Sequence, residues 1–386
     1  MRHYALDDEV RLGLGRELHH WRKAGLLTPG QEHVLRPDAA TDLRRTGAML
    51  RLALAAFTVL AGAAAIGLVA LITGMGSELT VAITAAVLGT AAFGASTTLV
   101  RTFRLYRYGV EETLAMAAVA LWGVSAALLA SQTFATTSSG GAWFFAMAAV
   151  AASCAATYRR FGFQYAAVSA LYATALLPMA SGSLDIGFTR IFAALVCAAA
   201  YVYASGARRR ADDDISRSDA EVIRAAAAVG AYLALNSVLP FGRSVDGWYK
   251  WTGWVVTWLL PFLVGHAAVM DRDPLLLRVA MVAGLASILT NKAHLGWPRQ
   301  PWDPMLLGVV LVGAALALRR WLSSGTGGER NGFTARPLVR RDGAMTELAS
   351  LASVAVQPAS TRPVPEPTNA TFSGGRSGGA GAGAEF

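Results

Sequence analysis

Residues 50–73 read LRLALAAFTVLAGAAAIGLVALIT, and this stretch decides the fold class of the chain. It is almost entirely apolar, and its single charged side chain, Arg51, stands next to its first residue. A helix needs roughly 20 mostly apolar residues to cross the hydrocarbon core of a bilayer. The sequence therefore predicts that this segment spans a membrane as a helix.

Nine further apolar stretches follow at short intervals. They are unbroken runs rich in Ala, Leu and Val, which indicates helices rather than the alternating strands of a barrel. We predict an all-α fold, a transmembrane helical bundle of about ten spans within residues 46–322. The spans are expected at residues 50–73, 79–100, 110–130, 142–157, 163–180, 187–205, 221–240, 250–270, 274–290 and 303–318. The fourth and ninth stretches are short, so we expect them to be tilted, broken or partly enclosed by protein.

The composition agrees with a membrane protein. Of 386 residues, 54% are hydrophobic and only 15% are charged, whereas a soluble domain usually carries about 25% charged residues. Cys154 and Cys197 lie inside apolar stretches and form no CxxC motif, so we interpret them as small buried hydrophobic residues. The first 48 residues are polar, so we expect no cleaved signal peptide, and we expect the first span to start insertion.

The positions of Lys and Arg predict the orientation. Of the 34 basic residues, 29 lie in the N-terminal region, the even-numbered connections and the C-terminal region, and five lie on the opposite side. Because basic residues near span ends favour the cytoplasm, we expect both termini to be cytoplasmic in a multi-pass protein of the inner (plasma) membrane. The same split favours the lipid bilayer, and not nucleic acid, as the partner of the positive charge.

Residues 1–45 are predicted to form a cytoplasmic helical hairpin. Val10, Leu14, Leu18 and Trp21 are spaced so that they fall on one face of a first helix, and Gly25 suits its C-terminal cap. We expect that face to pack on a second helix.

The second helix of the hairpin begins with a cap signature. Thr28 can cap it, Pro29 fits its first position, Gln31 completes a capping box, and Pro37 limits its length. The hairpin is too small for a core of its own. We therefore expect it to lean on the bundle, on a protein partner or on a second copy of the chain. Residues 323–386 are rich in Gly, Pro and Ser and are predicted to be a disordered cytoplasmic tail.

The hairpin carries a resemblance to a known family. The run LHHWRKAGLLTPGQ at residues 18–31 resembles the opening of a prokaryotic membrane-protein family of unknown function, in which Leu-x-x-Trp, Gly-Leu-Leu-Thr and Gln begin a cytoplasmic hairpin before many spans. Gln132-Thr-Phe134 is similar to a Gln-x-Tyr element of that family, with Phe in place of Tyr, and the polar residues after it depart from the family pattern. The resemblance covers about the first third of the chain and implies a bacterial inner-membrane protein.

Two charged motifs near the expected cytoplasmic ends are interpreted as structural. Glu111 and Glu112 open the third span, where acidic side chains favour a helix N-terminus. The acidic end of the run from Arg208 to Asp214 is expected to cap the following helix, and its basic end to meet lipid headgroups. The alternatives are a working carboxylate pair at 111–112 and a cation site at 212–214.

The expected outer side of the later spans holds the strongest candidates for a binding site. Aromatic faces beside polar groups can form a pocket for a sugar, a lipid headgroup or a cation, and the alternative is an aromatic belt at the headgroup level. His266 is the one histidine inside a span, and an ionisable group there is a functional candidate. The candidate binding residues are Gln132, Asn236, Trp248, Trp251, Trp254, His266, Asn291 and Trp297.

The sequence predicts no catalytic, cofactor or metal site. His19 and His20 are adjacent, so they point about 100° apart on a helix, and no HExxH spacing occurs. We therefore expect a protein that is not an enzyme, with no cofactor. The leading hypothesis is a scaffold for sensing, assembly or envelope maintenance that acts through its hairpin. The alternative is a small-molecule transporter or channel with an outer vestibule rich in tryptophan, in which Pro240 and Pro261 break two spans.

Overall fold

The computed structural model describes residue 4 and residues 6–23, 25–44, 46–74, 76–133, 140–180, 184–236, 238–239, 248–295, 300–325, 329–330 and 333–334. The chain divides into two units, Met1–Ala335 and Arg336–Phe386, and the second unit lies outside the described residues. Most of the predicted tail is therefore not described, and its disorder stays a prediction. Its described part contains β1 (Glu329–Arg330), which pairs antiparallel with β2 (Phe333–Thr334).

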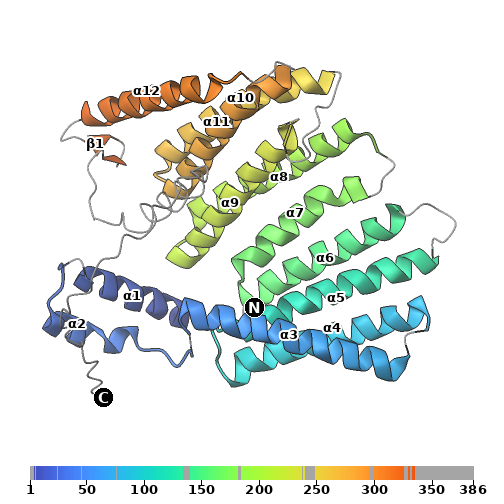
Figure 1. The fold of residues 1–386 in the computed structure, drawn as a ribbon. Helices are drawn as coiled ribbons and strands as arrows, with labels where there is room; N and C mark the ends of the chain where they lie inside the picture. Colours follow the sequence, from blue (N-terminus) through green and yellow to red (C-terminus); the bar gives the residue numbers. More distant parts are fainter. Residues whose placement is uncertain are drawn as a thin grey trace, which may run out of the picture. The chain divides into compact units, whose positions relative to one another are not determined.

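Within the described residues, ten helices occupy the ten apolar stretches (Figure 1). Eight of these are long and apolar enough to cross a membrane, so the part of the chain that is described has the helices of a multi-pass membrane protein. The ten are α3 (Ala48–Thr73), α4 (Glu78–Thr102), α5 (Val110–Thr133), α6 (Gly140–Phe161), α7 (Gln164–Ala180), α8 (Ile186–Arg210), α9 (Asp214–Leu235), α10 (Trp248–Met270), α11 (Pro274–Leu295) and α12 (Asp303–Ser323).

The two helices that fall short of a span are α7 and α9. The first has only 17 residues. The first turns of α9 carry several charged residues, and it is the most amphipathic of the ten. The sequence pointed instead to the fourth and ninth stretches, which form α6 and α11. Each of these helices is unbroken and is partly buried in protein, which is one of the outcomes expected from the sequence. Both α6 and α11 have 22 residues, and a stretch of each, Gly141–Phe161 and Pro274–Lys292, is long and apolar enough to cross a membrane.

Neighbouring helices pack in chain order. From α4 to α9 each helix contacts the next, and α9 also contacts α10 and α11 (Figure 1). Small residues make the closest of these contacts possible. Ala85 and Gly89 of α4 are buried, and a β-carbon at Gly89 would lie 3.0 Å from the Trp122 ring of α5. By contrast Ala63 and Gly67, which have the same spacing, are exposed on α3.

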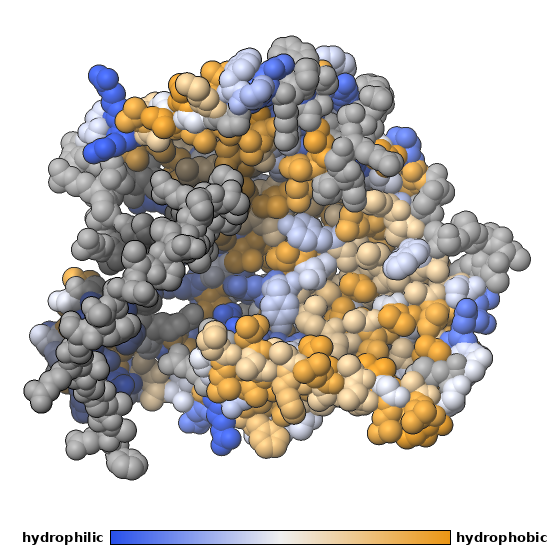
Figure 2. All heavy atoms as spheres, in the orientation of Figure 1, coloured by the Kyte–Doolittle hydropathy of each residue, from blue (hydrophilic) through white to orange (hydrophobic). Residues whose placement is uncertain are grey.

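The helices α3 and α12 bury none of their apolar residues within the described part of the chain. Figure 2 shows apolar side chains over the surface on which α3 and α4 lie in Figure 1. An apolar surface of this extent is stable only against lipid or protein. Both helices therefore present the kind of surface that a bilayer contacts.

The N-terminal segment contains α1 (Leu6–Lys23), α2 (Pro29–Leu35) and the short helix η1 (Pro37–Ala39). Gly25 ends α1 with a φ of 74°, and the Leu26 amide donates back to the Trp21 carbonyl at 2.9 Å, which is a Schellman cap. The Thr28 side chain and Gln31 form the capping box that the sequence predicts for α2.

The apolar face predicted for α1 is wrong in part. Leu18 is buried as expected, but Val10 and Trp21 are exposed, and Leu12 is buried instead. The reason is that α1 packs on α2, η1 and α9, and these neighbours select a face that periodicity alone does not.

Candidate functional site

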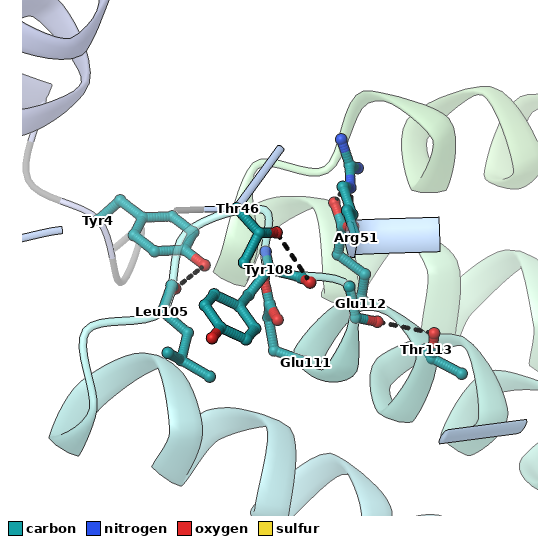
Figure 3. Close-up of polar contacts among 9 residues, drawn as sticks. Tyr4, Thr46, Arg51, Leu105, Tyr108, Glu111, Glu112 and Thr113 are labelled. Carbon is teal, nitrogen blue, oxygen red and sulfur yellow. Dashed lines mark hydrogen bonds and ion pairs between the residues drawn. The ribbon is translucent and has the colours of Figure 1, made fainter. Parts of the chain in front are cut away.

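The N-terminal segment docks on the connection between α4 and α5, residues 103–109. The Tyr4 hydroxyl donates to the Leu105 carbonyl at 2.9 Å, and the Thr46 hydroxyl donates to the Tyr108 carbonyl at 3.4 Å (Figure 3). Arg44 forms an isolated parallel bridge with Leu105. Side chains and backbone of the N-terminal segment therefore bind the backbone of a connection about 60 to 100 residues later in the chain.

Arg104 adds charge to this junction. Its guanidinium lies 2.9 Å from Asp42 and 3.4 Å from Asp8 of α1. Its φ of 53° is in the left-handed region, as is that of Arg107 at 50°, and such backbone is unfavourable for residues other than glycine. A strained connection that persists must be held by its surroundings, and here the N-terminal segment supplies those contacts.

A carboxylate pair lies on the bundle side of the junction. Arg51 at the start of α3 makes two parallel hydrogen bonds to the Glu112 carboxylate, from Nε at 2.7 Å and from Nη2 at 2.5 Å (Figure 3). Glu111 is fully buried and accepts from the Tyr108 amide at 2.6 Å, as expected for an acidic residue at a helix N-terminus. This geometry is that of a structural clamp, because an Arg–carboxylate fork fixes both partners.

Tyr4 itself is part of an apolar core. It packs with Val100, Ala115, Phe161 and Phe163, which come from α4, α5, α6 and the connection before α7. Burial, with a smaller contribution from Glu111 and Glu112, raises the pKa of the Tyr4 phenol above its ordinary value. The phenol therefore stays neutral and keeps donating its hydrogen bond.

Charged side chains join the last turn of α8, the helix α9 and the connection after α10. Arg208 donates to Glu221 of α9 and to the Asp271 carbonyl, each at 2.9 Å. The buried Arg224 lies 2.6 Å from the Asp271 carboxylate. Asp213 caps α9 by accepting from the Ser216 amide, as the sequence predicts for the acidic run. The basic end of that run, at Arg208, contacts protein, which the sequence did not indicate.

A buried polar network lies at the other end of α8, α9 and α11. Asn236 is fully buried, and its amide donates to the Tyr232 hydroxyl at 3.2 Å and to the Thr290 hydroxyl at 3.1 Å. Its side-chain oxygen accepts from the backbone amides of residues 238 and 239, and it lies 3.3 Å from His294 Nε2. Because that oxygen only accepts, a neutral His294 with a proton on Nε2 satisfies the contact.

The network reaches α10 and α8. Ser287 of α11 lies 3.0 Å from the Tyr232 hydroxyl and donates to the Thr257 carbonyl of α10 at 2.9 Å. Arg190 of α8 donates to the Asn236 carbonyl at 2.9 Å. Burial, and then the charges of Lys250 and Arg190, lower the pKa of His294. The arrangement holds four helices in register, and it keeps its histidine neutral near pH 7.

Three tryptophans of α10 and Asn291 of α11 form a second group, apart from the buried network. The indoles of Trp254 and Trp258 both donate to the Asn291 side-chain oxygen, at 2.9 and 3.3 Å. Trp251 is exposed and meets Trp254 edge to face, with ring centroids 6.3 Å apart. Asn291 is thus held by indoles, while Asn236 is held by the buried network.

The remaining predicted residues lie elsewhere. His266 is exposed on α10, nine residues or about 13 Å beyond Thr257 of the network. Gln132 is exposed at the end of α5 and donates to Glu78 of α4 at 3.0 Å. The Trp248 side chain, Trp297 and Pro240 lie outside the described residues. Pro261 lies inside α10, which continues through it as one helix.

Sequence reasoning missed most members of the buried network. Tyr232 and Asn236 are four residues apart, and Ser287, Thr290 and His294 follow at intervals of three and four. Such spacing places polar groups on one face of a helix. The signal was therefore present as a polar stripe within two apolar stretches, but only packing shows that the two stripes face one another.

Three cavities bounded by described residues are mainly apolar. One of about 760 Å³ lies between α3, α4 and α5, with Glu112 and Tyr165 among its lining residues. A second, of about 290 Å³, lies between α7, α8 and α9 and includes Arg190. A hollow of about 390 Å³ runs along α10 beside Trp254 and Trp258. Within the described part of the chain no group of three or more His, Cys, Asp or Glu is placed to hold a metal ion.

No family model, curated protein or solved structure matches this chain.

Proposed function

We propose that this chain is a non-enzymatic scaffold of a bacterial inner membrane, which uses residues 1–45 to bind a protein partner in the cytoplasm. The observation that carries the proposal is the docking of this segment on residues 103–109. Tyr4, Arg44 and Thr46 join it to the backbone of that connection, and Arg104 pairs with two of its carboxylates. A segment docked in this way places its exposed residues at a defined position beside the connection between α4 and α5.

The outer surface of the same segment supports a partner. Trp21, Leu26, Val34 and Leu35 are exposed, and Leu26 and Val34 are more than two-thirds exposed. An ion pair between Arg22 and Glu32, 2.8 Å long, holds α1 and α2 together beside these apolar residues. Apolar side chains that are exposed on a fixed, otherwise polar segment are typical of a protein interface.

The wider assignments are part of this proposal. In it, α7 and α9 complete ten spans, both termini face the cytoplasm, and the chain is a member of the family that residues 18–31 resemble. The basic residues at the ends of the helices support the orientation. The charges of α9 support ten spans. Glu221 pairs with Arg208 and Arg224 pairs with Asp271, and the second half of the helix is apolar.

Site-specific photocrosslinking in cells tests the scaffold. A photoreactive amino acid at Leu26 or Val34 should capture a discrete protein partner, whereas one at Asp38, which is exposed and polar, should not. The double variant Leu26→Asp and Val34→Asp should abolish capture from a third position, Trp21. Equal capture at Asp38, or a set of co-purifying proteins that is unchanged when residues 1–45 are deleted, would contradict the proposal.

Transport is the second candidate function, and the buried network favours it. Ionisable and polar groups at membrane depth often mark a substrate path, and Arg190, Asn236 and His294 are all buried at one end of the helices. The tryptophan-rich vestibule predicted around Trp251 and Asn291 belongs to this candidate. Substrate uptake into proteoliposomes that survives Trp251→Ala and Asn291→Ala would remove that vestibule from the path.

A further inference from the structure

The largest of the three cavities lies between α3, α4 and α5. Its volume is about 760 Å³, which is within the range of small-molecule sites. Its lining residues in α5 run from Glu112 to Leu121, and a helix rises about 13 Å over that distance, so the cavity is an elongated slot. Helix α3 packs mainly on α5 and buries none of its apolar residues within the described part of the chain. The slot therefore lies beneath a helix that is loosely packed on its neighbours.

The walls of the slot offer little to water. The Thr58 and Thr113 hydroxyls each donate to a backbone carbonyl four residues earlier, at 2.7 Å. The Glu112 carboxylate accepts two hydrogen bonds from Arg51. These polar lining groups already have partners within the protein, whereas a buried water needs two to four polar partners of its own. Hydrocarbon suits such a space better than water does.

The polar lining residues are concentrated at one end. Glu112 and Thr113 lie in the first turn of α5, and Tyr165 lies in the first turn of α7. Away from this end the slot is lined by apolar residues such as Leu88 and Leu121. A slot that is polar at one end and apolar along its length matches a lipid chain with its head at the polar end. The distribution of basic residues predicts that this end is cytoplasmic.

The polar end has no unpaired charge of its own. Glu112 is the one charged residue among the described residues that line the slot, and the Arg51 guanidinium pairs with it. A ligand is therefore selected by its hydrocarbon chain and not by the charge of its headgroup.

The slot is continuous with the surface that contacts lipid. Val59 and Ile66 of α3 line it, and each is more than a third exposed. They belong to the apolar surface over α3 and α4 that Figure 2 shows. A second helix fits less well, because a helix about 10 Å wide and 13 Å long takes up roughly 1,000 Å³, which exceeds the cavity. A lipid chain can enter from the bilayer and is narrow enough to fit.

We propose that one acyl chain of a phospholipid in the cytoplasmic leaflet fills this slot, with the headgroup at the end formed by Glu112 and Tyr165. The lipid holds α3 on the bundle, because it supplies the van der Waals contacts that small lining residues such as Gly62 and Ala92 do not make across the slot. The proposal is independent of the scaffold function, because it uses no residue of the segment 1–45.

Native mass spectrometry of the full chain tests the occupancy. The protein is reconstituted with phosphatidylcholine and phosphatidylglycerol in equal amounts and is then extracted into detergent. One phospholipid should stay bound to each chain after the lipids on the outer surface have exchanged for detergent. Both phospholipids should be retained about equally, because the polar end of the slot carries no unpaired charge.

A matched set of variants shows whether the retained lipid lies in the slot. Ala63→Phe and Ala117→Phe fill the slot from two different helices, and each should reduce the retained phospholipid severalfold. Ala64→Phe is the control, because residue 64 is exposed at the same depth of α3 and does not line the slot. Added phospholipid should raise the melting temperature of the natural chain and of Ala64→Phe, but not that of Ala63→Phe. If Ala117→Phe does not fold, the pair in the exposed helix α3 still decides the question.

A crosslink identifies the occupant directly. A diazirine amino acid in place of Met116, which lines the slot in α5, should capture a phospholipid on illumination. Capture of a protein segment, from this chain, a second copy or another protein, would overturn the proposal, and so would capture of a free fatty acid. Equal retention of lipid by Ala63→Phe and Ala64→Phe, loss of all lipid from the natural chain in detergent, or a strong preference for phosphatidylglycerol would also contradict it.

Discussion

Among the described glycines, Gly109 has the closest neighbour at the position of an added β-carbon. Its φ of 105° is open to glycine and strained for other residues, and a β-carbon there would collide with the backbone oxygen of Arg51. The Arg51–Glu112 clamp depends on this close approach, because residue 109 immediately precedes α5. One glycine therefore sets the distance between the start of α3 and the start of α5.

Gly109→Ala should lower the free energy of unfolding by about 1–3 kcal/mol, the usual cost of one strained backbone position. Denaturant unfolding in detergent would measure the change. Gly94→Ala is the control, because that glycine is exposed within α4 and has open space around its β-carbon position. The control should be neutral or slightly stabilising, and an equal loss in both variants would contradict the role of the Arg51 contact.

His294 makes stability depend on pH. Its pKa in the folded protein is lowered from the ordinary value of 6.5, so the unfolded chain binds its proton first as the pH falls. The stabilisation is complete above about pH 6.5 and is lost as the pH falls from there toward the lowered pKa. The melting temperature in detergent should therefore drop between about pH 7 and pH 5.

His294→Gln keeps a donor for Asn236 and removes the titration. Its melting temperature should change less over this pH range than that of the natural chain. His266→Gln is the matched control, since His266 is exposed on α10 away from the network, and it should reproduce the natural pH dependence. If the melting temperature of His294→Gln depends on pH as strongly as that of the natural chain, another group causes the dependence.

At the scale of elements, α1 is held to the bundle by few contacts. Tyr4 and Arg104 supply one hydrogen bond and two ion pairs, and the ion pairs are partly exposed, which limits each to at most about 1 kcal/mol. The free energy needed to release α1 from the bundle is therefore small compared with that of global unfolding, since regions of one protein can open locally with different free energies.

Combining Tyr4→Phe with Arg104→Ala should release α1 without unfolding the bundle. Hydrogen exchange of the α1 amides should become severalfold faster, while exchange in α4 and α5 stays the same. Arg22→Ala is the comparison, because it removes an ion pair between α1 and α2 and no contact with the bundle. Equal acceleration in both proteins would mean that docking on residues 103–109 does not hold α1.

At the scale of the whole molecule, the order of helix packing restricts the topology. Helices that follow one another from α4 to α9 lie side by side, which is the arrangement of an up-and-down bundle with short connections. The orientation predicted from the charges then alternates along the chain. Since Cys154 and Cys197 are buried, introduced cysteines can report on it.

Cysteines at Asp38 and Asp212 should react with a membrane-impermeant maleimide only after the cells are permeabilised. Cysteines at Ser77 and Leu184 should react in intact cells, because the distribution of basic residues predicts that α3 and α7 end on the opposite side. All four positions are described and lie outside the ten helices α3 to α12. The reverse pattern would invert the orientation, and protection of position 184 alone would show that α7 does not cross.

The sequence by itself determined the fold class, because each apolar run must bury its backbone polar groups in a helix. It placed all ten helices, with ends that differ by up to seven residues, as at the start of α9, and it placed the caps at Gly25, Thr28 and Asp213, because these signals are local. Only the tertiary structure decided which face of α1 is buried and that Asn236 and His294 meet. The face of α1 depends on its packing against α2, η1 and the distant α9, and Asn236 and His294 are 58 residues apart in the chain. A polar stripe on one apolar helix does not reveal the stripe that it will face.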